Sequence, residues 1–94
     1  MTYVLVRITV EDLAKWTPVF EEVSALRKKY GSISAQAFSK VENPNELTIL
    51  GQFTNEKRAR ELYQSQELRD AMQRAGVKGP PELTFLNEVV KLSA

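Results

Sequence analysis

The chain has 94 residues, 13 basic and 12 acidic side chains, a net charge of +1, and neither histidine nor cysteine. The missing residue types exclude disulfides, thiol nucleophiles, histidine triads and most transition-metal and haem sites, so we expect no metal and no cofactor. The balanced charge argues against a nucleic-acid-binding protein that depends on a basic surface.

The length favours one domain over residues 1–94, with a modest core. No apolar run approaches the ~20 residues that span a bilayer, so we expect no membrane partner. The N-terminus leads directly into strand-like sequence, without the basic segment of a signal peptide. Because the lack of cysteine also fits a reducing compartment, we expect a cytoplasmic protein.

The first 30 residues predict a strand followed by a long helix. Residues 3–10, YVLVRITV, are mostly β-branched and apolar, which indicates a buried strand. Apolar side chains then recur every three or four residues from 13 to 30, which predicts an amphipathic helix. Glu11-Asp12 would cap its start and Gly31 would end it. Pro18 is expected either to start the regular part of this helix or to kink its first turns.

A hairpin is predicted next. Residues 33–41 alternate in the manner of a strand, and residues 47–53, LTILGQF, form the returning strand. Asn43-Pro44-Asn45 between them is a turn signal.

The last third of the chain predicts two short helices and a final strand. The helices are expected at about residues 55–64 and 66–75, with Ser65 as the N-cap of the second. The glycines and prolines of residues 76–81 would stop the second helix and stiffen an extended approach to the strand. That strand is expected from about Glu82 to Leu92.

The order of these elements is the βαββαβ pattern of an α+β, ferredoxin-like fold. Right-handed crossovers place the helices on one face of a four-stranded antiparallel sheet and leave the other face bare. Both alternating sets of side chains in the first and last strands are largely apolar, which indicates that the bare face is covered by a partner. We expect a symmetric homodimer through this sheet face, with Leu5 and Leu86 in the interface.

Two segments carry a family resemblance: VLVRITVEDLAKWTPVFEE and SQELRDAMQRAGVKGPPELTFLNEV. They resemble the dimeric α/β-barrel superfamily, in particular its small stand-alone antibiotic-biosynthesis-monooxygenase-like proteins, some of which are loosely labelled cyclases. The resemblance implies a dimeric α/β barrel with a cavity between helices and sheet. It also implies oxidation of aromatic polyketides without metal or flavin. Close relatives often carry a histidine where this chain has Ile8-Thr9, and the histidine ligand of the haem-degrading members is absent.

Four side chains are candidates for contact with a small apolar or aromatic ligand. Trp16 and Phe20 lie one turn apart and form either an aromatic cavity wall or ordinary core. Met72 and Tyr63 are expected to face the same space from the helix pair. Tyr63 could donate a proton to a ligand, although a core tyrosine with its hydroxyl at the rim fits the pattern as well. Phe85 in the last strand is a further candidate for ligand contact.

Arg7 and Asn87 are the remaining catalytic candidates. Arg7 is a charge within an otherwise apolar strand. It could bind an anionic or enolate oxygen, or form an ion pair with Glu88 or with another acid across the sheet or the dimer barrel. Asn87 shares a predicted strand face with Phe85 and could orient a ligand carbonyl or serve the structure alone.

Three functions remain open. The first is cofactor-independent oxidation or cyclisation of a small aromatic or polyketide-type substrate. The second is a non-catalytic, homodimeric binding or structural module. RNA binding through the sheet is the third, and it is disfavoured because residues 47–53 lack the aromatic and basic side chains it needs.

Overall fold

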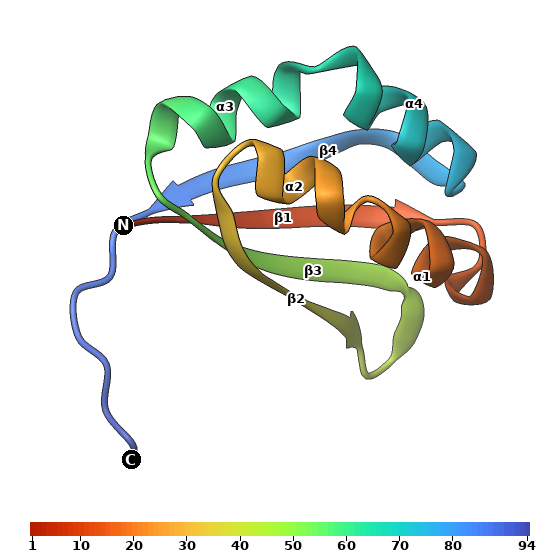
Figure 1. The fold of residues 1–94 in the computed structure, drawn as a ribbon. Helices are drawn as coiled ribbons and strands as arrows, with labels where there is room; N and C mark the ends of the chain where they lie inside the picture. The colour runs from red at the N-terminus through yellow and green to blue at the C-terminus, as the bar shows by residue number, and fades with distance from the viewer.

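The computed structural model describes all 94 residues and shows a four-stranded antiparallel sheet with four helices on one face (Figure 1). The sheet order is β2-β3-β1-β4. The two helical pairs follow β1 and β3, so the predicted ferredoxin-like βαββαβ fold is confirmed. The elements are β1 (Thr2–Val10), α1 (Leu13–Glu22), α2 (Ser24–Lys29), β2 (Ser32–Lys40), β3 (Asn43–Phe53), α3 (Glu56–Gln64), α4 (Gln66–Arg74) and β4 (Val77–Leu86).

The core lies between the sheet and the helical layer. Because side chains alternate along a strand, one set from β1 points to the helices, and all four of its members are buried: Val4, Val6, Ile8 and Val10. Phe53 from β3 and Leu62 from α3 are the largest fully buried side chains. None of the helices has the length and apolar character needed to cross a lipid bilayer.

The helix expected from residue 13 to 30 is in fact two helices. Pro18 lies inside α1 without ending it, and the chain turns only at Val23, which joins α1 to α2. The helix already begins at Leu13, so the alternative that Pro18 starts its regular part is wrong. Asp12 caps α1 as expected, since its carboxylate accepts a hydrogen bond from the Ala14 N–H at 2.9 Å. The turn at Val23 carries Arg27 back toward the end of α1.

The hairpin turns two residues earlier than predicted. Lys40 pairs with Asn43, so the chain reverses at Val41 and Glu42, and β3 already begins at Asn43. Proline is tolerated at position 44 because the ladder between β1 and β3 starts only at Glu46, so no N–H is needed there.

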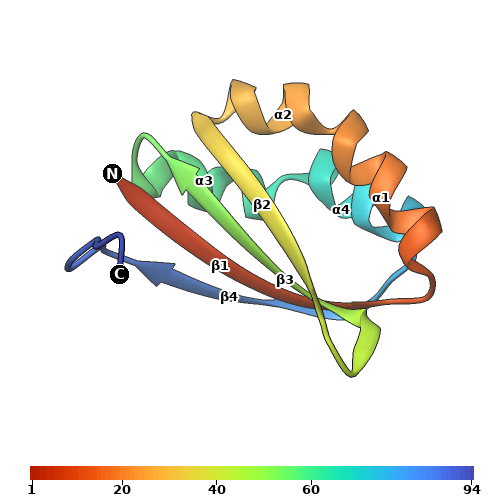
Figure 2. The same ribbon diagram turned by 90° about the horizontal axis from the view of Figure 1, so that it is seen from below.

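The last strand is also shifted. β4 starts at Val77 and ends at Leu86, so the expected strand from Glu82 to Leu92 is wrong. The pairing passes from Arg7–Glu82 to Thr9–Lys78, which leaves Gly79, Pro80 and Pro81 as a bulge within β4. The prolines are therefore part of an edge strand and do not precede it. Residues 87–94 form no regular structure and leave the sheet (Figures 1 and 2).

The second face of the sheet carries no helix (Figure 2). Leu5 points to this face, because its neighbours Val4 and Val6 point to the core. Two side chains lie on the same face as Leu5: Leu50, which pairs with it, and Phe38, which pairs with Thr48. Phe38 is 50% exposed and Leu86 is 38% exposed. We call this surface the open face.

Candidate ligand cavity

A cavity of about 60 Å³ lies between the helical layer and the sheet. It is lined by 18 residues, of which 15 are hydrophobic; they come from three strands and from the helices, and none comes from β4. A cavity that holds a benzene ring measures roughly 150 Å³. An aromatic ligand therefore fits only when the lining side chains or the helices move apart.

Two stacked aromatic rings form one wall of the cavity. Trp16 and Phe20 lie four residues apart on α1, which places them on one side of the helix. Their ring centres are 4.6 Å apart and their planes are inclined by 21°. Trp16 is only 6% exposed. These residues are thus core and cavity wall at once, so the two interpretations of the sequence are compatible.

Arg27 supplies the charged group of the cavity lining. Its Nη1 donates a hydrogen bond to the Phe20 carbonyl at 2.8 Å, and its guanidinium lies 4.2 Å from the centre of the Phe20 ring. The guanidinium forms no ion pair with any carboxylate within 4.0 Å, whereas six other cations do. Its partial burial lowers the pKa of Arg27.

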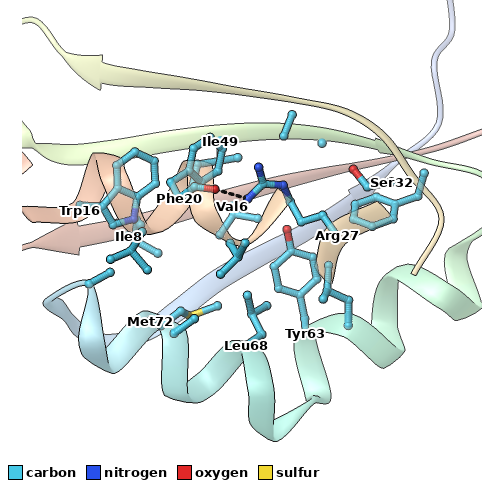
Figure 3. Close-up of a pocket in the computed structure, with 18 residues that line it drawn as sticks. Val6, Ile8, Trp16, Phe20, Arg27, Ser32, Ile49, Tyr63, Leu68 and Met72 are labelled. Carbon is cyan, nitrogen blue, oxygen red and sulfur yellow. Dashed lines mark hydrogen bonds between the residues drawn. The ribbon is translucent and has the colours of Figure 1, made fainter. Parts of the chain in front are cut away.

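Tyr63 approaches from α3, and its hydroxyl points toward Arg27 (Figure 3). Burial raises the pKa of Tyr63 to about 12, although the charge of Arg27 acts in the opposite direction. The phenol is therefore neutral at pH 7, so its hydroxyl is available as a hydrogen-bond donor and not as a base. No aspartate or glutamate lines the cavity, and the structure holds no cluster of acidic side chains placed to bind a metal ion.

Solved structures share this architecture along nearly the whole chain. A proposed antibiotic biosynthesis monooxygenase from Bordetella bronchiseptica has a TM-score of 0.81 and 14% identity, covering 95% of this chain and 97% of its own. SnoaB, a cofactor-independent oxygenase from Streptomyces nogalater, has a TM-score of 0.78 and 14% identity, covering 99% and 97%. The Streptomyces coelicolor monooxygenase from the gene ActVA-Orf6, in complex with nanaomycin D, has a TM-score of 0.71 and 18% identity, covering 99% and 91%.

This chain has the fold of the antibiotic-biosynthesis-monooxygenase-like proteins. The resemblance inferred from the sequence is thus confirmed at the level of the fold. No family model matches the sequence, and no curated protein matches it.

Within this monooxygenase-like fold, four of the predicted site residues meet at the cavity. Trp16, Phe20, Tyr63 and Met72 all line it, and Met72 reaches it from α4. Arg27 was missed, but the sequence did contain a signal. Arg27 continues the apolar stripe of the helix, because the stripe runs at steps of four, three and four residues through Trp16, Phe20, Val23 and Arg27.

The other three predicted residues lie away from the cavity. Arg7 is exposed on the open face, opposite Glu82, so it is not the buried charge that the strand pattern indicated. The expected ion pair between Arg7 and Glu88 does not form, and Glu88 instead accepts a 3.4 Å hydrogen bond from the Tyr3 hydroxyl.

Phe85 and Asn87 are separated by the end of the strand. Phe85 packs against the core, with the Arg60 guanidinium 3.9 Å from its ring centre. Asn87 follows the last residue of β4 and is exposed, so it shares no strand face with Phe85. Neither residue lines the cavity of this monooxygenase-like fold.

Proposed function

We propose that the protein binds a small aromatic substrate in this cavity and oxidises it with dioxygen, without metal or flavin. The observation that carries the proposal is the combination of a nearly apolar cavity with an aromatic wall and an arginine that has no carboxylate partner. The fold supports it, since SnoaB is a cofactor-independent oxygenase and the ActVA-Orf6 protein is a monooxygenase that holds nanaomycin D.

The cavity lining limits how such a reaction proceeds. Direct reaction with dioxygen requires an electron-rich substrate, such as the anion of a phenol or an enol. Arg27 is placed to stabilise the negative oxygen, and Tyr63 to donate a hydrogen bond to it. The lining provides no carboxylate that could act as a general base. The substrate is therefore an acidic phenol or enol that loses its proton to solvent. For 1-naphthol, the products would be 1,4-naphthoquinone and one molecule of water.

A titration with 1-naphthol tests binding. Trp16 is the single tryptophan of the chain, so its indole N–H gives one resolved NMR signal that reports on the cavity wall. We expect this signal to shift with saturation. Ala71→Leu fills space at the cavity lining and should abolish the shift, whereas Ala25→Leu on the exposed side of α2 should leave it intact. An unmoved signal in the wild type would refute binding at this site.

Oxygen uptake separates the enzyme from the alternative, a non-catalytic binding module. The small cavity volume and the lack of a base favour this alternative. Uptake of dioxygen with 1-naphthol or another electron-rich phenol, in the presence of a metal chelator, would support the oxygenase, provided that Ala71→Leu abolishes it. Saturable binding of such phenols without any uptake would identify the module.

We further infer that the open face forms a homodimer interface. Five side chains of this face are apolar or aromatic and are covered by no helix: Tyr3, Leu5, Leu50, Phe38 and Leu86. Arg7, Thr48 and Glu82 form a polar part of the same face. A second copy presents the same surface, so two sheets can face each other across a two-fold axis.

A further inference from the structure

Arg27 differs from the other charged side chains of the protein. The six ion pairs of the structure join side chains that are all 39% to 64% exposed. Arg27 is half-buried, faces an apolar cavity and has no ion pair. A cation that is partly removed from water without a counter-charge is unfavourable. Arg27 is the single charged side chain that lines this otherwise almost entirely apolar cavity.

The guanidinium of Arg27, which lies on α2, is held in position by Phe20 of the preceding helix α1. Nη1 is held by the Phe20 carbonyl at 2.8 Å, and the plane rests against the Phe20 ring at 4.2 Å. The remaining N–H groups make no hydrogen bond to the protein side chains or backbone. Every fully buried side-chain nitrogen or oxygen in the structure has a hydrogen-bond partner. The unpaired N–H groups of Arg27 and the Tyr63 hydroxyl are therefore not fully buried. A ligand oxygen can reach them.

We propose that the cavity selects aromatic monoanions, whose charged oxygen is held by the Arg27 guanidinium and the Tyr63 hydroxyl while the ring contacts Trp16 and Phe20. This inference rests on the proposed function and specifies its substrate class. Both donors point to the same part of the cavity (Figure 3), and the rest of the lining is almost entirely apolar. The charged oxygen belongs to either a carboxylate or a phenolate. Both anions accept hydrogen bonds from a guanidinium in the same way.

A purely structural role for Arg27 makes a different prediction. In that case the side chain only satisfies the Phe20 carbonyl at the end of α1, and its charge is irrelevant to ligands. Arg27→Gln separates the two roles, since glutamine can still donate to a carbonyl but carries no charge. Lys28→Gln is the matched control, because Lys28 is an exposed cation on the same helix, forms no ion pair and does not line the cavity.

The experiment compares two ligands of nearly equal shape, 2-naphthoate and the neutral 2-naphthalenemethanol, by the Trp16 indole signal at pH 7. We expect the wild type and Lys28→Gln to bind the anion about 10- to 100-fold more tightly than the alcohol, the range for hydrogen bonds to charged groups. Arg27→Gln should bring this ratio close to one. If Arg27→Gln does not fold, Arg27→Lys retains the charge and should retain a preference for the anion.

The outcomes distinguish this inference from the proposed function. Equal binding of both ligands by the wild type would overturn the anion selectivity and leave aromatic binding in place. No binding of either ligand would overturn both. Bound 1-naphthol that shows the absorption of its phenolate at pH 7 would identify a phenolate as the natural anion. Preference for naphthoate without such ionisation would identify a carboxylate.

Discussion

Replacing Leu62 by alanine tests whether the cavity and the core are built as described. Leu62 lies on α3, is 0% exposed and lines the cavity. Buried Leu→Ala changes cost about 2.7–5.0 kcal/mol. We expect a loss of about 3 kcal/mol in the free energy of unfolding, near the lower limit, because the side of Leu62 that faces the cavity has few contacts to lose. For a domain of this size, such a loss lowers Tm by roughly 12–24 °C.

Urea unfolding measures this loss, and the slope of the transition should stay unchanged. Leu92→Ala is the matched control, because it deletes the same atoms from a side chain that is 75% exposed beyond β4. It should change the free energy of unfolding by less than about 0.5 kcal/mol. Similar losses for the two variants, or a loss below about 1 kcal/mol for Leu62→Ala, would refute the described packing.

The same variant links stability to binding. The space left by the Leu62 side chain joins the existing cavity, so a bicyclic ligand requires less movement of the helices. We expect 1-naphthol to raise the Tm of Leu62→Ala more than that of the wild type, because a tighter ligand stabilises the folded state more. An equal or smaller shift would show that the lost side chain does not limit the cavity.

Two further predictions concern pH and assembly. The pKa of Tyr63 is raised to about 12 in the folded protein, against about 10 in the unfolded chain, so its contribution to stability is complete below pH 10 and is lost between about pH 10 and 12. Tyr63→Phe should therefore unfold with a weaker pH dependence in that window by urea titration, and an unchanged pH dependence would contradict the partial burial of the Tyr63 side chain. Light scattering should give twice the chain mass for the wild type and the chain mass for a folded Leu5→Lys, Leu86→Lys double variant, whereas a stable wild-type monomer would refute the interface.

The sequence alone predicts those helices and strands whose pattern of apolar side chains lies within one continuous segment. The apolar strand β1 and the amphipathic stripe from Trp16 to Val23 needed no tertiary information. The turn at Val23 was not predictable in this way, because the three- and four-residue spacing continues across it. The position of Arg27 depends on that turn. Its place in the cavity lining was therefore missed, although its spacing was visible.

The last strand shows a second limit of sequence patterns. Val89 and Val90 have the composition of a strand, but β4 pairs with β1, and Tyr3 already pairs with Leu86. Since β1 begins at Thr2, it offers at most one further partner, Thr2 opposite Asn87, and none for Val89 or Val90. Pairing partners, not propensity, decide where this strand ends. The predicted role of Asn87 depended on the longer strand.

The bulge at Gly79, Pro80 and Pro81 has a consequence for the behaviour of the protein at high concentration. An edge strand with free N–H and C=O groups is a template on which another chain can add a strand, and aggregation often begins there. In β4 the two prolines have no N–H to offer, and the bulge interrupts the regular spacing of the groups that remain. This edge of the sheet is thereby protected against the addition of a foreign strand.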